Sequence, residues 1–242
     1  MDYELLMNAN VKIGMQAPDF EAVTTMGIIN LNDYRGKWIV LFSHPGDFTP
    51  VCTTEIIAMA NANTYFENLN TKLIGLSVDS NSSHLAWLYD IYLRTGITVP
   101  FPIISDRNGT IARKYGMISN DISNTETVRN VYIINPEGIV KSILIYPIEV
   151  GRFIPEISRL IKALQITECC KVSTGANWMP GNPLIMRTPQ NFKELQDASQ
   201  NLQQSGNGIG WYLRFQNPKE CETNNQIGVT ENNELNFKNL NN

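Results

Sequence analysis

The chain has 242 residues, 43% of them hydrophobic, and a formal net charge of −4. This length predicts one large domain, or a domain with an appendage, and the apolar content suffices for a sizeable core. An acidic chain with a pI near 5.3 has no basic stripe for nucleic acid. No run approaches the roughly 18 apolar residues of a membrane span, and residues 1–14 lack the apolar stretch of a secretory signal. We therefore expect a cytoplasmic protein that binds neither nucleic acid nor membranes.

The four cysteines are too few and too irregularly spaced for a disulfide framework. Cys52 stands alone, Cys169 and Cys170 are adjacent, and Cys221 lies far downstream. Neighbouring cysteines rarely bridge each other, because the geometry is strained. A zinc site needs paired ligands such as C-x₂-C, and the sequence has no such pair. We therefore expect reduced thiols, no metal and no cofactor.

Strand and helix patterns alternate along the first two thirds of the chain. The run WIVLFS at 38–43 predicts a buried strand. A helix is predicted directly after it, with Thr49 as the N-cap and Pro50 at the first helical position. The other predicted elements are strands at 28–30, 72–78 and 101–105, helices at 80–96, 109–116, 151–165 and 192–202, and a hairpin formed by 127–135 and 138–147.

This order of elements predicts an α/β fold with a mixed sheet flanked by helices. We expect residues 1–167 to form the main domain. Residues 168–221 are turn-rich, so we expect an ordered C-terminal arm with little core that packs on a partner subunit. Residues 222–242 are rich in Asn and lack apolar periodicity, which predicts a loose tail.

Cys52 lies in the first turn of the helix predicted after 38–43. Unpaired backbone N–H groups and the helix dipole favour negative charge there, and this environment is typical of reactive cysteines. A free cysteine is also often a small buried hydrophobic residue. Its position alone leaves both interpretations open.

The stretch PGDFTPVC contains Pro45, Thr49 and Cys52 in a P-x-x-x-T-x-x-C arrangement. This arrangement resembles that of the peroxiredoxins (AhpC/TSA family), in particular their one-cysteine, peroxiredoxin-6-type branch. The resemblance covers about residues 13 to 218. Its other motifs follow in order: APDF, FSHP, GLSVDS, VRNVYIINPEG with Arg129, YPIEVGR with Arg152, and VSTGANW and WYLRFQNP in the arm.

The resemblance implies a thioredoxin-like fold and a thiol peroxidase that forms a sulfenic acid at Cys52. It implies that Thr49 hydrogen-bonds the peroxide, that Pro45 shields the sulfur and that Arg129 is a fixed cation beside it. Arg152 would support this cluster. Backbone N–H groups of Val51 and Cys52 would complete the donors.

Several residues keep two interpretations. Arg129 and Arg152, taken singly, could be solvated charges. His44 is either a substrate-pocket residue or a histidine at a strand end. Glu55 either pairs with an arginine or favours the helix start as an acid in its first turn.

The resemblance also implies a hydroperoxide substrate, a homodimer, with a decameric ring left open, and an external reductant that is a thioredoxin-like protein or a small thiol. Archaeal members of the branch carry two further cysteines in the arm, where this chain has Gly208 and Arg214. Cys221 is therefore either a shifted resolving thiol or an idle cysteine.

Other functions need features that the sequence does not mark. A cysteine hydrolase with His44 as base would need a third, orienting residue. A thioredoxin-type oxidoreductase normally needs C-x-x-C, and Thr-Thr follows Cys52. The alternative kept beside the peroxidase is a non-enzymatic redox sensor or a chaperone-like holdase.

Overall fold

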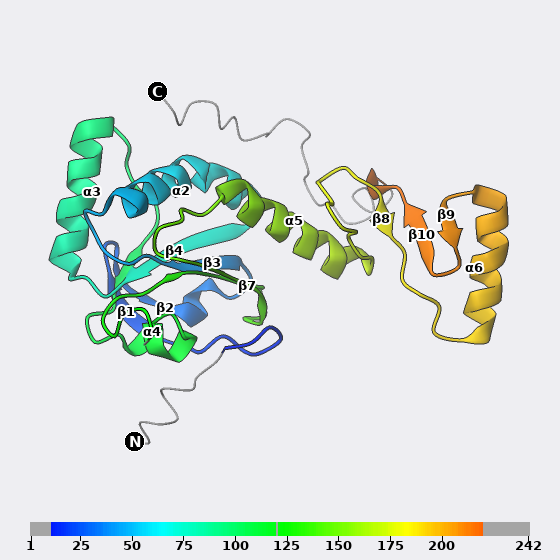
Figure 1. The fold of residues 1–242 in the computed structure, drawn as a ribbon, viewed down its shortest axis with the longest axis horizontal. Helices are drawn as coiled ribbons and strands as arrows, with labels where there is room; N and C mark the ends of the chain where they lie inside the picture. The colour runs from blue at the N-terminus through cyan, green and yellow to red at the C-terminus, as the bar shows by residue number, and fades with distance from the viewer. Residues whose placement is uncertain (1–10, 120, 220–242) are drawn as a thin grey trace, which may run out of the picture. The chain divides into compact units, whose positions relative to one another are not determined.

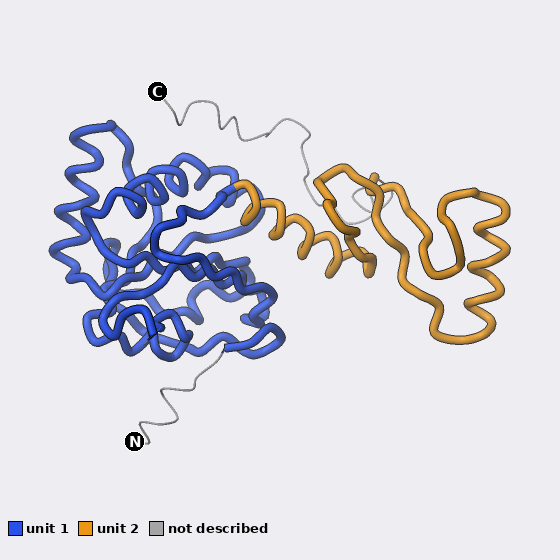
Figure 2. The backbone as a smooth tube through the Cα atoms, in the orientation of Figure 1, with its two compact units in different colours: residues 1–154, 235–242 blue, residues 155–234 orange. Residues whose placement is uncertain are grey.

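The computed structural model describes residues 11–119 and 121–219. The described residues form two compact units, one ending at Ile154 and the other beginning at Pro155 (Figure 2). The first unit has a central mixed sheet with helices packed on it (Figure 1), which confirms the predicted α/β class. Within the described ranges, no helix is both long enough and apolar enough to cross a membrane.

The sheet of the first unit has seven strands in the order β2-β1-β5-β4-β3-β6-β7. β3 pairs in parallel with β4, and β4 with β5, while the remaining pairs are antiparallel. The sheet is therefore mixed, with β4 and β3 near its centre. The strands are β1 (Glu21–Thr24), β2 (Gly27–Asn30), β3 (Trp38–Ser43), β4 (Thr71–Ser77), β5 (Ile103–Ser105), β6 (Arg129–Ile134) and β7 (Val140–Tyr146).

The helices of this unit begin and end at the residues that the sequence marks. α2 has Thr49 as its N-cap and Pro50 at its start, as predicted. The Ser80 side chain caps α3 by accepting from the Ser83 N–H, and Gly96, in the left-handed region, ends it. The helical segments are the 3₁₀ turn η1 (Leu31–Tyr34), α2 (Pro50–Asn68), α3 (Asn81–Thr95) and α4 (Thr110–Tyr115).

One large apolar core lies between the sheet and α4. Ile39 and Leu41 of β3 join Ile74 and Leu76 of β4 in one buried cluster, because side chains two apart on a strand share a face. Tyr115 of α4 packs into the same cluster. α2 lies on the other side of the sheet (Figure 1).

The second unit has a smaller core. It consists of Ala163, Ile166, Val172, Trp178 and Leu184. The predicted helices near 151–165 and 192–202 are present, whereas the sequence did not predict the three-stranded sheet β8-β10-β9. The elements are α5 (Ile154–Cys170), β8 (Leu184–Ile185), α6 (Phe192–Ser205), β9 (Gly208–Gly210) and β10 (Leu213–Gln216).

Candidate active site

Cys52 lies at the junction of β3 and α2. It is the third residue of α2, and its side chain is fully buried. The Thr49 hydroxyl donates to the Gly46 carbonyl oxygen at 2.9 Å and makes no side-chain cap of the helix. Phe48 has a φ of 56°, a left-handed conformation that is uncommon for a bulky residue and is often found at functional sites. The loop thus presents an uncapped helix start next to the sulfur.

Arg129 holds a guanidinium group at this sulfur. It is the first residue of β6, which pairs with β3. Its Nη1 donates to Sγ of Cys52 at 3.3 Å, and its Nε donates to the Ile148 carbonyl oxygen at 2.8 Å. The side chain is only 2% exposed, which excludes a solvated surface charge. A fixed guanidinium at this distance stabilises negative charge on a sulfur.

Glu55 joins the two arginines of the site. It accepts from Arg129 Nη1 at 2.6 Å, and from Arg152 Nε and Nη2 at 2.8 and 2.7 Å. Burial would raise the pKa of Glu55, but the neighbouring Arg152 and Arg129 lower it below its usual value. The carboxylate is therefore ionised and serves as the anchor of both guanidinium groups, which agrees with the arginine-pairing interpretation.

Arg152 forms hydrogen bonds with three segments of the chain. Its Nη1 donates to the carbonyl oxygens of Ser43 and Asn130, at 2.9 and 3.0 Å. Its guanidinium carbon lies 5.1 Å from the centre of the Phe42 ring, within the range of a cation–π contact. The side chain is buried. The end of β3 and the start of β6 are thereby fixed to α2 through Glu55.

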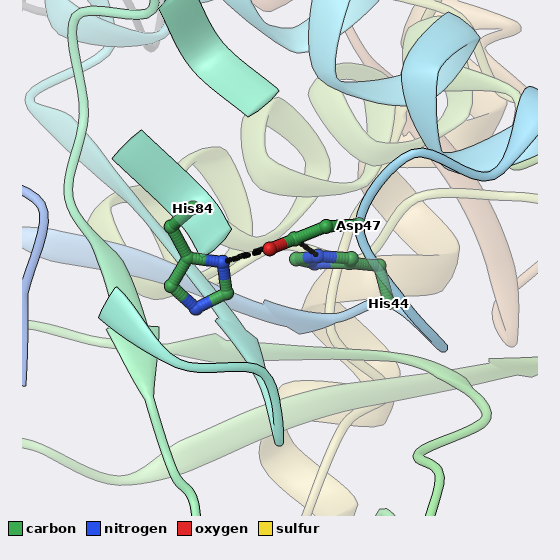
Figure 3. A group of neighbouring side chains, drawn as sticks. All are labelled: His44, Asp47 and His84. Atoms are coloured by element: carbon green, nitrogen blue, oxygen red, sulfur yellow. Dashed lines mark hydrogen bonds and ion pairs between the residues drawn. The ribbon is translucent and has the colours of Figure 1, made fainter. Parts of the chain in front are cut away.

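A second buried cluster lies beside the loop and consists of His44, Asp47 and His84 (Figure 3). His44 Nε2 lies 3.2 Å from Oδ1 of Asp47, and His84 Nδ1 lies 2.9 Å from each Asp47 oxygen. Burial alone would raise the pKa of Asp47, but hydrogen bonds from both histidines lower it strongly. Burial lowers the pKa of His44 despite that hydrogen bond. The cluster holds one carboxylate between two imidazoles.

The same three side chains are of the types that bind metal ions, and their ligand atoms lie within 4.8 Å of one another. Each contact within the cluster, however, pairs a ring nitrogen with a carboxylate oxygen at hydrogen-bond distance. The cluster is thus held together by hydrogen bonds between its own side chains.

The structure brings most of the predicted site residues together. Pro45 is buried next to the cluster, and Val51 is half-buried immediately before Cys52. Cys169 is an exposed free thiol of α5, and Cys221 lies outside the described residues. The predicted residues placed around the β3–α2 junction are His44, Pro45, Thr49, Val51, Cys52, Glu55, Arg129 and Arg152.

Sequence reasoning missed Asp47 and His84. They are 37 residues apart, and neither belongs to the motif that marks Cys52. The available signal was that the chain has only two histidines, and that the loop after His44 carries an aspartate. A pairing of both histidines with that aspartate was not derivable from spacing.

Comparison with known proteins gives a consistent family. The model of the AhpC/TSA family matches residues 13–143. A peroxiredoxin 2 of Caldanaerobacter subterraneus is 52% identical over 204 residues, which are 84% of this chain and 92% of the relative. A peroxiredoxin of Thermoplasma volcanium is 48% identical over 205 residues, which are 85% of this chain and 98% of the relative.

Solved structures agree with these relatives. A crystal structure of a mutant of the peroxiredoxin 6 of Arenicola marina has a TM-score of 0.76 at 35% identity and covers 86% of this chain and 98% of that chain. A yeast mitochondrial 1-Cys peroxiredoxin has a TM-score of 0.73 at 37% identity, and the match covers 86% of this chain and 99% of that chain. The fold is therefore the thioredoxin-like fold that the resemblance implied. The findings favour the thiol peroxidase over a non-enzymatic redox sensor or holdase. With its buried cysteine at a helix start and an arginine at the sulfur, the chain belongs to the AhpC/TSA family of peroxiredoxins.

Proposed function

We propose that Cys52 is the thiol that reduces hydrogen peroxide and organic hydroperoxides. The observation that carries this proposal is the 3.3 Å contact between Arg129 Nη1 and the buried Sγ of Cys52 at the start of α2. The helix start and the guanidinium place two sources of positive potential at one sulfur. In the described part of the chain the other free thiol, that of Cys169, is exposed and lies on α5, away from this motif in the sequence.

The reaction consists of one two-electron step. The Cys52 thiolate attacks the nearer peroxide oxygen, so that an S–O bond forms while the O–O bond breaks. The sulfur is oxidised to a sulfenic acid, and the peroxide is reduced. The departing oxygen leaves as hydroxide or alkoxide and takes up a proton to become water or an alcohol. Catalysis therefore requires alignment of the peroxide and donors at the departing oxygen.

Residues of the loop and of the helix start supply that alignment in this proposal. The Thr49 hydroxyl donates its proton to the Gly46 carbonyl oxygen, so its lone pairs remain available to accept from a peroxide O–H. Backbone N–H groups of Val51 and Cys52 donate to peroxide oxygens. Arg129 stabilises developing negative charge, and Pro45 shields the sulfur from water.

Three further residues support these donors. Glu55 and Arg152 hold Arg129 in place through the contacts described above. His44 contributes to the wall of the substrate pocket.

We further propose that the protein works in the cytoplasm as a homodimer in which residues 168–221 serve as the arm. A decamer built from such dimers is the larger assembly to test. The reductant of the sulfenic acid is a thioredoxin-like protein or a small thiol. The solved yeast mitochondrial relative is described as resolved by glutathione and thioredoxin systems, which supports this class of reductant. Light scattering at several protein concentrations tests the assembly.

The experiment that tests the role of Cys52 exposes the fully reduced protein to one equivalent of hydrogen peroxide with dimedone present. Peptide mass spectrometry then maps the adducts. We expect a dimedone adduct on Cys52 and loss of peroxide consumption in Cys52→Ser. The matched control, Cys169→Ser, should consume peroxide at the wild-type rate. Peroxide consumption that persists in Cys52→Ser would refute the proposal.

The same experiment without dimedone decides how the sulfenic acid is resolved. A Cys52 that remains a sulfenic acid until an external thiol is added indicates a one-cysteine cycle. A disulfide between Cys52 and Cys221, abolished in Cys221→Ser, indicates that Cys221 is a resolving thiol.

A further inference from the structure

Both ring nitrogens of His84 face hydrogen-bond acceptors. Nδ1 lies 2.9 Å from both oxygens of Asp47, and Nε2 lies 3.2 Å from the carbonyl oxygen of Ile104. A carbonyl oxygen can only accept, and so can an ionised carboxylate. A neutral imidazole has only one N–H, so it would leave a lone pair facing one of these acceptors. Both acceptors would receive a hydrogen bond only if both nitrogens of the buried His84 ring carried protons.

His44 differs from His84 at its second nitrogen. Its Nε2 faces Asp47 and donates to it, but its Nδ1 is buried without a hydrogen-bond partner among the described residues. A proton on Nδ1 would be a buried donor without an acceptor, which costs free energy. Burial also disfavours the charged ring and lowers the pKa of His44. His44 is therefore neutral, with its proton on Nε2 and a free lone pair on Nδ1.

The other charges around the cluster agree with this assignment. The positive charge of Arg152 disfavours protonation of the His44 ring and so lowers the pKa of His44. Oδ2 of Asp79 accepts from the Asp47 N–H at 3.0 Å and from Ser77 Oγ at 2.8 Å, and no contact joins it to either histidine. A doubly protonated His84 ring on α3 would therefore neutralise the Asp47 carboxylate.

Packing connects the His44 ring to the start of α2. The ring lies against Trp87, with centroids 5.3 Å apart, and Trp87 Nε1 donates to Thr53 Oγ1 at 3.2 Å. Thr53 follows Cys52 directly. The His44 backbone carbonyl also accepts from Thr127 Oγ1 at 2.7 Å, two residues before Arg129. The ring is therefore held beside the segments that carry the sulfur and its arginine.

We propose that Asp47 and His84 are positioning residues for the peroxidase reaction: an Asp47 carboxylate and a His84 imidazolium hold His44 as the neutral Nε2–H tautomer, so that its Nδ1 is a hydrogen-bond acceptor during peroxide reduction. This proposal rests on the proposed role of Cys52. Its parts are separable, because the protonation of the two rings does not depend on which thiol reacts.

Nitrogen-15 NMR of the full chain, labelled at histidine and kept reduced, reads the protonation directly. With two histidines in the chain, His44→Gln and His84→Gln assign every ring signal. At pH 7 we expect both ring nitrogens of His84 to be protonated. For His44 we expect a protonated Nε2 and an unprotonated Nδ1. A bare nitrogen on His84, or loss of its ring protons on adding zinc, would overturn the assignment.

Substitution of Asp47 tests the consequence for catalysis. In Asp47→Asn the amide can donate to Nε2, which lets the proton of His44 move to Nδ1 and removes the acceptor. An analogous tautomer error is costly in other enzymes. We expect Cys52 oxidation by peroxide to slow by about tenfold or more, while circular dichroism remains that of the wild type. Asp90→Asn, at an exposed position of α3, is the control and should keep the wild-type rate.

His84→Gln supplies an independent readout. Without the imidazolium of α3, the buried carboxylate of Asp47 has only His44 to neutralise it. We expect His44 to gain its second proton at a higher pH than in the wild type, and the pH profile of Cys52 oxidation to shift with it. An unchanged His44 titration would overturn the proposal. An unreactive Cys52 with the expected ring signals would instead refute the proposed function and leave the charge assignment standing.

Discussion

Arg152 donates two parallel hydrogen bonds to Glu55, from Nε to Oε1 at 2.8 Å and from Nη2 to Oε2 at 2.7 Å. The backbone N–H of Arg152 adds a third contact to Oε1, also at 2.8 Å. Both side chains are buried, and a bidentate pair of this kind has a defined geometry as well as charge complementarity. Because Glu55 also binds Arg129, the position of the guanidinium at the sulfur depends on this pair.

Glu55→Gln should destabilise the protein. The change leaves two buried guanidinium groups without their shared carboxylate, and breaking a buried pair in this way typically costs about 3–5 kcal/mol. We expect a decrease of that order in the free energy of unfolding, measured with urea on the reduced protein. Glu67→Gln is the control, because its pair with Lys72 is largely exposed and is worth no more than about 1 kcal/mol. Equal losses in the two variants would contradict the anchoring role of Glu55.

The acid side of the stability profile should depend on Glu55. Its pKa in the folded protein lies below the ordinary value of 4.5, so its stabilisation is complete above pH 4.5 and is lost as the pH falls toward the folded-state pKa. We expect the free energy of unfolding to decline below about pH 4.5, and the decline to be shallower in Glu55→Gln. The pKa of Asp47 is also lowered. The free energy of unfolding of Glu55→Gln should therefore still decrease as the pH falls further. A slope identical to that of the wild type would show that Glu55 is not ionised in the fold.

Arg129 should be needed for the rate of peroxide reduction. Arg129→Gln removes a fixed cation from the sulfur, and loss of one such donor typically slows a reaction by about 100-fold or more. Arg129→Lys should recover only part of the loss, because a lysine cannot contact Cys52, Glu55 and the Ile148 carbonyl oxygen in one plane. Stopped-flow tryptophan fluorescence during oxidation measures these rates.

The control for this series is Arg94→Gln, which alters an exposed arginine paired with Asp90. It should react at the wild-type rate. An Arg129→Gln variant that folds normally and also reacts at that rate would contradict the assigned role of Arg129.

Thr49 should act through its hydroxyl rather than through its bulk. Thr49→Ser keeps the donor to the Gly46 carbonyl oxygen and should retain most of the peroxidase rate. Thr49→Val keeps the shape but has no hydroxyl, and we expect a loss of about 100-fold, as for other groups that orient a reacting oxygen. Because Thr49 makes no side-chain cap of α2, thermal denaturation should distinguish the variants little. A valine variant as active as the serine variant would contradict the proposed contact.

Local patterns predicted the β3–α2 junction well. The run of six apolar and small residues at 38–43 is buried throughout, and Thr49 followed by Pro50 marked the start of the helix. β1 was not predicted, because its four residues, EAVT, are too few to show a clear alternation of exposed and buried side chains. It forms a strand by pairing with β2 and β5. The small sheet of the second unit escaped for the same reason, since its strands have two to four residues.

Long-range contacts mark the limit of sequence reasoning at the site. The sequence suggested a role for Arg129 only through a family resemblance, because 77 residues separate it from Cys52. The pairing of Asp47 with His84 required the structure, since it depends on α3 lying beside the loop. Burial of Glu55 also required the structure, because acidic side chains are mostly exposed. The alternative that Glu55 is an acid in the first turn is wrong, since no acidic residue lies in the first turn of α2.

The buried charges around the sulfur do not cancel in every oxidation state of Cys52. Two arginines share one glutamate, which leaves one positive charge in excess among these buried side chains. A thiolate balances that charge, and a neutral sulfenic acid does not. A sulfinate, which is the next oxidation state, carries negative charge again and restores the balance. The arrangement that supports the reactive thiolate should therefore also stabilise the product of a second oxidation, so that resistance to excess peroxide depends on how quickly the sulfenic acid is reduced.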